Sequence, residues 1–219
     1  MLKKVLKYIG IAILSYLALS VLLTIAYTVI NPPFTILMMQ RPSKIERQWV
    51  DIEDISPNMI QAVVASEDNL FLTHSGFDFE QIKIAREEAK RKNKPMRGAS
   101  TISQQTAKNV FLWNGRSYFR KGLEVWHTFL IETFWSKERI MEVYLNVIEY
   151  GDGVYGIEAA SQHYFNRSAK KLSKRQSALI AAALPSPLKR NPAHPTKYLN
   201  RRANKIMRLM NNIGPVKFD

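Results

Sequence analysis

One stretch of the chain, residues 56–71, indicates the class of fold; it reads SPNMIQAVVASEDNLF. A serine followed by a proline is typical of a helix start, because a serine side chain caps the helix and proline fits its first position. Ile60 and Val63 recur at helical spacing and predict one apolar face. Glu67 follows Val63 by four residues and Ile60 by seven, so this apolar face carries a carboxylate. Burying a carboxylate costs free energy unless the group is paired or has a chemical role.

Glu67 has two interpretations at this stage. Partial burial disfavours the charged form and raises the pKa of a carboxyl group, which suits a general base near neutral pH. The alternative is a structural carboxylate paired with an arginine, and helical spacing alone favours that alternative. The neighbouring Asp68 points about 100° away around the helix and is expected to cap a helix or make structural hydrogen bonds.

The rest of the chain predicts one mainly α domain. Helical periodicity dominates residues 56–212, whereas the alternation typical of strands is scarce. Caps, turns and prolines divide it into further helices, expected from Ser100 or Thr101 towards Trp113, over 117–135, over 137–149, from a Ser173–Gln176 capping box to Leu184, and over 197–212.

The N-terminal segment predicts a membrane anchor. Residues 8–30 carry no formal charge and, at about 1.5 Å per residue, can cross a hydrocarbon core of about 30 Å. A cleaved signal peptide is the alternative, but its apolar region should span only about 7–15 residues. Lys3, Lys4 and Lys7 precede the span, so the positive-inside rule places the N-terminus in the cytoplasm and the rest of the chain outside it.

Four regions are expected on this basis: a cytoplasmic tail over 1–7, a transmembrane helix over 8–30, a membrane-proximal linker over 31–49 and a folded domain over 50–219. Two consecutive prolines just after the span stop its helix, because proline lacks the backbone donor. Residues 34–39 are apolar, and they either rest in the membrane interface or form a first core element.

The composition narrows the class of partner. The chain has 219 residues, with 32 Lys and Arg against 18 Asp and Glu, and a formal net charge of +14. Such a balance suggests nucleic acid, phospholipid head groups or a phosphorylated substrate, and a merely solubilising surface is the alternative. The chain has no cysteine, which excludes disulfides and thiolate metal sites.

A polar stripe is expected on the helix that follows residue 100. Ser100, Gln104 and Lys108 stand at positions i, i+4 and i+8, with Gln105 and Asn109 beside them. Such a stripe can hydrogen-bond sugar hydroxyls and bring a cation to a phosphate. A solvated polar face explains the same periodicity.

Cations accumulate just after this stripe. Lys108, Arg116, Arg120 and Lys121 lie within fourteen residues. Arg120 and Lys121 stand one turn before Glu124, so an intrahelical ion pair worth about 0.2–0.5 kcal/mol is one explanation. The other is an anion site, since unit charges about 4 Å from a phosphate gain several kcal/mol at intermediate dielectric, enough to assist a pyrophosphate leaving group.

Four segments carry a resemblance to a known family; they read EDNLFLTHSG at 67–76, GASTISQQTAKN at 98–109, RKGLE at 120–124 and KERIMEVYLN at 137–146. They resemble, in order, the motifs ED-x-x-F-x-x-H-x-G, G-x-S-T-x-x-Q-Q-x-x-K-N, R-K-x-x-E and K-x-x-I-L-E-x-Y-L-N of the peptidoglycan glycosyltransferases of family 51, specifically the monofunctional biosynthetic kind. Met141 stands where leucine is usual, a conservative exchange.

The resemblance covers roughly residues 50–195 and implies a mainly α, lysozyme-like glycosyltransferase domain after a single N-terminal transmembrane helix. It implies polymerisation of lipid II into β-1,4-linked peptidoglycan strands with release of undecaprenyl pyrophosphate. The implied location is the bacterial inner membrane, single-pass, with the catalytic domain on the periplasmic side. The implied partners are lipid II, the growing glycan strand, the bilayer and other cell-wall synthesis proteins, but not nucleic acid.

Roles follow from the same resemblance. Glu67 would be the general base on the acceptor hydroxyl, and Glu124 would orient groups around the donor phosphates. His74 would be structural. The substrate and its pyrophosphate would be bound by Ser100, Gln104, Gln105, Lys108, Asn109, Arg116, Arg120 and Lys121. No cofactor is assigned; a divalent cation, Mg²⁺ or Mn²⁺, if used, would be held by oxygen ligands, with Glu124 as the candidate, and by substrate phosphates.

Two rival functions and one absent activity complete the expectations. A lysozyme-like glycan-cleaving enzyme would use the same fold and a buried glutamate, but its chemistry has no pyrophosphate to neutralise. A basic, anchored protein that only binds anionic lipids or nucleic acid is the non-enzymatic rival. A transpeptidase activity is not expected, because Ser168 and Ser186 begin S-x-x-K segments but no K-T-G follows.

Overall fold

The computed structural model describes residues 1–40, 44–93, 98, 100–115 and 117–218. This part of the chain is mainly α, as predicted. Its helices are α1 (Leu2–Ala26), α2 (Ile36–Met39), α3 (Pro57–Glu67), α4 (Phe79–Lys92), α5 (Ile102–Phe111), α6 (Tyr118–Phe134), α7 (Lys137–Val147), α8 (Ile157–Phe165), α9 (Lys174–Ala183) and α10 (Lys197–Ile213), with 3-10 turns η1 (Ile52–Asp54) and η2 (Ala169–Lys171).

A small sheet holds three short strands in the order β1-β3-β2, namely β1 (Glu46–Arg47), β2 (Glu149–Gly151) and β3 (Val154–Tyr155). β2 and β3 are antiparallel neighbours, and β1 runs parallel to β3. The sequence did not predict this sheet, because two- and three-residue strands are too short to show alternation.

Most helix starts follow the predicted capping chemistry. The Ser56 hydroxyl accepts a hydrogen bond from Asn58 N at 3.3 Å and begins α3. Ser117 and Ser136 cap α6 and α7 in the same way. The predicted box of Ser173 with Gln176 begins α9. These local signals are independent of tertiary contacts, so sequence reasoning finds them.

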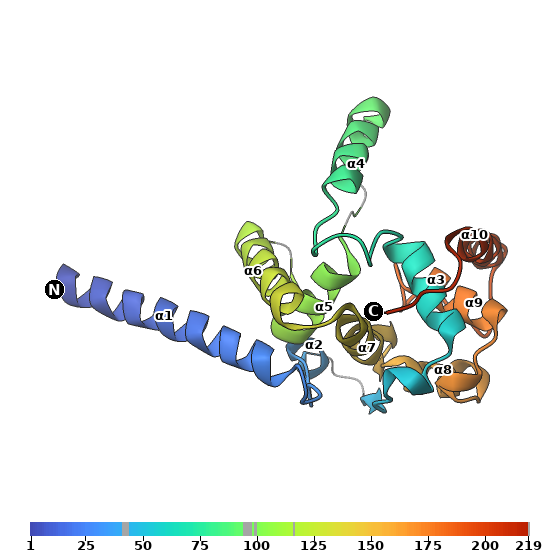
Figure 1. Ribbon diagram of the computed structural model, residues 1–219, viewed down its shortest axis with the longest axis horizontal. Coiled ribbons are helices and arrows are strands. Elements are labelled where there is room, and N and C mark those ends of the chain that lie inside the picture. The colour runs from blue at the N-terminus through green and yellow to red at the C-terminus, as the bar shows by residue number, and fades with distance from the viewer. Residues whose placement is uncertain (41–43, 94–97, 99, 116, 219) are drawn as a thin grey trace.

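Two helices, α4 and α8, were not predicted. Ala85 is the one residue of α4 that is classed as buried, so this helix lacks the apolar stripe that periodicity detects. Its beginning is marked by Asp78, whose carboxylate accepts from Gln81 N at 2.8 Å. Figure 1 shows α4 projecting away from the other helices, which agrees with its exposed surface.

The helices pack into two apolar clusters. The larger contains side chains of α3, α5, α7 and α8, among them Ile102, Ile140 and Tyr144. The second lies where α3, α9 and α10 meet (Figure 1). The apolar helix face predicted from residues 56–71 is confirmed in α3, since Ile60 and Val63 are buried.

Helix α1 extends away from the remaining helices and contacts α6 (Figure 1). It is long and apolar enough to cross a membrane, and only 11% of its most apolar window is buried, unlike a core helix. Three hydrogen bonds join it to α6 and the following residue: Tyr16 with His127 at 2.8 Å, Trp126 to the Ser20 hydroxyl at 3.0 Å and Trp135 to the Thr24 carbonyl at 2.8 Å. The helix ends at Ala26, before the predicted Ile30, and the chain continues in turns.

The stretch expected to be a linker takes part in the folded structure. Met38 of α2 is fully buried in the larger cluster, while Phe34 and Met39 are exposed. β1 joins the sheet through its pairing with β3. Residues 34–39 therefore contribute a core element and also leave apolar side chains on the surface.

Candidate active site

A cavity of about 810 Å³ collects side chains from α3, α5, α6 and α10. Eight of the residues predicted for the site line it: Glu67, Ser100, Gln104, Gln105, Lys108, Arg120, Lys121 and Glu124. The cavity therefore combines a carboxylate at the end of α3 with a group of cations on α5 and α6.

Glu67 is the last residue of α3, and its carboxylate is largely shielded from solvent. Oε2 accepts a hydrogen bond from Gln105 Nε2 at 3.3 Å. Oε1 is buried and has no hydrogen-bond partner among the described residues. Burial raises the pKa of Glu67, while the Gln105 hydrogen bond and the charge of Arg202 act in the opposite direction. An oxygen without a partner and a raised pKa are properties of a general base, whereas a structural carboxylate would be fully hydrogen-bonded.

Gln105 is oriented by a residue that the sequence analysis did not name. The Tyr144 hydroxyl donates to Gln105 Oε1 at 3.3 Å. Because the oxygen of the amide accepts this bond, its nitrogen faces Glu67. Tyr144 is almost fully buried on α7, so it holds Gln105, and through it Glu67, in a fixed position.

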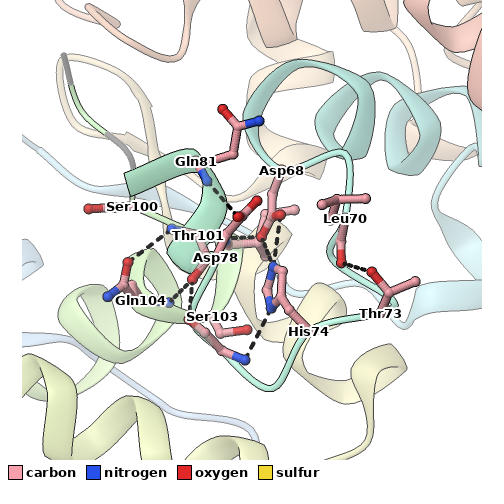
Figure 2. Close-up of polar contacts among 12 residues, drawn as sticks. Asp68, Leu70, Thr73, His74, Asp78, Gln81, Ser100, Thr101, Ser103 and Gln104 are labelled. Atoms are coloured by element: carbon pink, nitrogen blue, oxygen red, sulfur yellow. Dashed lines mark hydrogen bonds and ion pairs between the residues drawn. The ribbon is translucent and has the colours of Figure 1, made fainter. Parts of the chain in front are cut away.

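Asp68 fastens the end of α3 to the start of α5. Both of its carboxylate oxygens lie within 3.0 Å of His74 Nε2 (Figure 2). Gly76 N donates to His74 Nδ1 at 3.1 Å, so Nε2 carries the proton and donates to Asp68. Ile102 N donates to Asp68 Oδ2 at 2.9 Å. Asp68 thus makes the structural hydrogen bonds expected of it, and His74 is its structural partner.

The start of α5 differs from the expected stripe. Thr101 is the N-cap, and Gln104 closes a capping box by accepting from Thr101 N at 3.1 Å. Ser100 therefore precedes the helix (Figure 2) and does not stand on its face. It does line the cavity. The prediction that Ser100, Gln104 and Lys108 form one helical stripe was wrong. The Thr101 hydroxyl caps α5, so the helix begins at Ile102 and Ser100 lies in the extended segment before it.

Lys108 brings a cation to the cavity from the last turn of α5. Burial lowers the pKa of its ammonium; the Glu124 carboxylate raises that pKa, and the cations of α6 lower it. Asn109, by contrast, does not line this cavity. Its side chain donates to the Gln105 carbonyl at 2.7 Å and borders a separate cavity of about 240 Å³.

Helix α6 supplies a compact charged group. Arg120 Nη1 lies 3.0 Å from Glu124 Oε2, and Lys121 Nζ lies 2.5 Å from Glu124 Oε1. The intrahelical ion pairs considered from the sequence are present. Glu124 is only 3% exposed and has a cation on each oxygen, so a metal ion there would have to displace one of them. Arg116, expected beside these residues, lies outside the described residues.

No group of three or more His, Cys, Asp or Glu residues in the described part of the chain is arranged to hold a metal ion. The described acidic residues of the cavity other than Glu67 have partners: Asp68 binds His74 and α5, Asp78 caps α4, and Glu124 binds two cations. A divalent cation would therefore depend on ligands supplied by a bound substrate.

Helix α10 contributes cavity residues that the sequence analysis missed. Arg202, Lys205 and Leu209 line the same cavity as Glu67. The sequence did indicate a basic amphipathic helix over 197–212, but nothing in it linked that helix to a glutamate 135 residues earlier. Only the packing of α10 on α3 and α9 reveals the link.

Within one mainly helical fold, a buried carboxylate oxygen and several cations line the same cavity, an arrangement typical of enzymes that act on anionic substrates. Residues 35–211 match the family described as Transglycosylase, and the chain belongs to that family. It is therefore an enzyme, and its domain has the lysozyme-like fold of the family.

Curated relatives agree with this assignment. A protein of Bacteroides thetaiotaomicron is 50% identical over 219 residues, which cover 95% of this chain and 88% of that protein. One of Caulobacter vibrioides is 54% identical over 189 residues, which cover 85% of this chain and 82% of that protein. One of Pseudomonas syringae pv. syringae is 45% identical over an alignment of 223 residues, which covers 98% of this chain and 94% of that protein. Each is named biosynthetic peptidoglycan transglycosylase.

Proposed function

We propose that this chain polymerises lipid II into β-1,4-linked peptidoglycan strands and releases undecaprenyl pyrophosphate. The names of its relatives support peptidoglycan as the product. The observation that carries the proposal is the unpartnered, buried Oε1 of Glu67 in a cavity that also contains Lys108 and Arg120.

In the proposed reaction Glu67 takes the proton of the acceptor 4-hydroxyl, and the hydroxyl oxygen attacks C1 of the donor sugar. The bond between C1 and the pyrophosphate oxygen breaks, and the pyrophosphate leaves with the bonding electron pair. Lys108, Arg120 and Lys121 would stabilise the negative charge that develops on this leaving group. Glu124 would hold the two cations of α6, which both bind it, in place.

The hydrolase alternative is less consistent with this cavity. A lysozyme-like enzyme needs a second carboxylate about 5–9.5 Å from the first and no cation cluster. The three other described acidic residues that line the cavity are engaged: Asp68 binds His74, Asp78 caps α4, and Glu124 binds two cations. We also attribute no transpeptidase step to the chain, since no K-T-G follows Ser168 or Ser186.

We further propose that α1 crosses the bacterial inner membrane once, with residues 1–7 in the cytoplasm and the domain on the periplasmic side. The exposure of its apolar side chains and the three lysines at its beginning support this orientation. The bilayer, the lipid-linked substrate and other cell-wall synthesis proteins are then the partners, and nucleic acid is not. We assign 50–219 to the catalytic domain and 31–49 to a membrane-proximal segment that contributes Met38 and β1 to the same fold.

The decisive experiment incubates the full chain in detergent with labelled lipid II. The wild type should form glycan strands, and Glu67→Gln should lose about 10²- to 10⁴-fold in rate with its melting temperature unchanged. Glu53→Gln, on an exposed turn away from the cavity, is the matched control and should polymerise normally. Cleavage of finished strands without consumption of lipid II would establish the hydrolase instead.

A further inference from the structure

Helix α10 forms a wall of the cavity with one side and packs with the other. Leu199, Ala203 and Met210 are buried against its neighbours. Arg202 and Leu209 lie on the side that faces the cavity. Figure 1 shows α10 beside α3, whereas α6 lies on the side of α1. The cavity therefore has a second source of positive charge, separate from the α6 group.

Two polar atoms of this cavity are buried without a partner among the described residues, Glu67 Oε1 and Arg202 Nε. One is an acceptor and the other a donor, and both residues line the cavity. Native proteins rarely leave buried polar atoms unpaired, so a ligand, a water molecule or a reacting group is expected to satisfy these two. No ion pair within 4.0 Å joins the two described residues, so the carboxylate oxygen stays free.

We propose that Arg202 is the positioning residue whose charge favours the ionised form of Glu67 against the effect of burial, while leaving Oε1 open to the acceptor hydroxyl. The inference rests on the proposed function. A direct arginine–carboxylate contact would occupy the oxygen that must take a proton, and it would make the carboxylate a weaker base. A positive charge held at a longer distance favours the carboxylate and does not block it.

The other groups that face Glu67 do not replace Arg202. The charge of Asp68 opposes ionisation, and the amide of Gln105 supplies one neutral hydrogen bond. The buried Tyr144 phenol of α7 is neutral, and its pKa is raised by burial and by Glu67. Arg190 also favours the carboxylate, with a smaller effect than that of Arg202.

Arg190 is committed to a structural position, unlike Arg202. It donates to the Ala182 carbonyl at 3.0 Å and lies over the Tyr198 ring at 5.2 Å from the centroid. Arg202 makes no such contact with a described residue, and its Nε–H is buried. Its charge is therefore available to Glu67 and to the substrate.

The test compares pH–rate profiles of the full chain in detergent on labelled lipid II. Arg202→Met should move the acid limb, which reports ionisation of Glu67, upwards by about one pH unit, so that activity recovers at higher pH. Arg202→Lys should restore the wild-type limb. Arg201→Met removes the exposed neighbouring charge and should leave the profile unchanged.

A second measurement separates this inference from the proposed function. The carboxyl carbon of Glu67 is titrated by NMR in protein with ¹³C-labelled glutamate, and its resonance is assigned by its loss in Glu67→Gln. The midpoint should rise by about one unit in Arg202→Met whether or not lipid II is consumed. If Arg202→Met fails to fold, Arg202→Gln, which keeps a polar side chain, takes its place. An unshifted midpoint and acid limb in a folded neutral variant overturn the inference, even if its rate is lower.

Discussion

Replacing Asp68 by asparagine should destabilise the junction between α3 and α5. The carboxylate is 6% exposed and accepts hydrogen bonds from His74 Nε2 and from Ile102 N. Ile102 N donates to Oδ2, and His74 Nε2 lies near both oxygens, so in an amide of the same size an NH₂ donor faces His74 Nε2–H whichever way the amide is turned. The change also removes a negative charge from the N-terminus of α5, where the helix dipole favours it.

The magnitude follows from these contacts. Losing one hydrogen bond to a charged group costs about 1.5–3 kcal/mol, and losing the charge at the helix end costs about 0.5–1 kcal/mol. The expected loss of about 2–4 kcal/mol corresponds to a melting temperature about 5–15 °C lower for a protein of this size.

The assay is thermal unfolding of the full chain in detergent, followed by circular dichroism. Asp54→Asn is the matched control, since Asp54 pairs with Lys170 on the surface with both side chains more than half exposed. It should change the free energy of unfolding by less than about 1 kcal/mol. Equal melting temperatures for the two variants would refute the conclusion that the hydrogen bonds of Asp68 stabilise the junction between α3 and α5.

Two further stability predictions concern α6 and its surroundings. Gly76 has φ +83°, and a Cβ there would lie 2.8 Å from Thr128 Cγ2, so Gly76→Ala should lower the free energy of unfolding in urea by about 1–3 kcal/mol. A Cβ at Gly122 would meet no atom within 4 Å, so Gly122→Ala should raise the free energy of unfolding by about 0.5–1 kcal/mol. Burial lowers the pKa of His127 from 6.5 to about 4, so the unfolded chain binds its proton first and stability should fall as pH drops from about 6.5 to 4. His127→Gln should flatten that part of the stability curve, and an identical curve for wild type and variant would contradict this explanation.

Sequence reasoning succeeded where the signal is local. The serines that cap α3, α7 and α9 could be predicted from the sequence, because a cap bonds to the backbone of its own helix. It left open whether Ser100 or Thr101 begins α5, and it wrongly placed Ser100 on the face of that helix, because the choice of cap depends on a contact with distant residues. The Thr101 hydroxyl donates to the Gly76 carbonyl at 2.7 Å, which favours Thr101 at the start of α5.

The candidate-site residues on α3, α5 and α6 were predicted from the sequence, whereas those on α7 and α10 were not. Motif spacing named Glu67 and the cations of α5 and α6, which are close in sequence to one another. Arg202 and Tyr144 were missed, since their proximity to Glu67 and Gln105 arises from packing between helices far apart in the chain. Periodicity identifies which face of a helix is apolar, but it does not say which other helix that face meets.

The contacts of α1 make the anchor part of the architecture of the enzyme. Tyr16, Ser20 and Thr24 repeat every four residues, so they form one line along the helix that meets Trp126, His127 and Trp135. An engineered or exchanged anchor of equal length and hydropathy would keep the chain at the membrane but would lose this line of contacts. The domain would then no longer have a fixed orientation relative to its anchor. The sequence of the N-terminal helix, and not only its hydropathy, should therefore constrain how such chains diverge or are recombined.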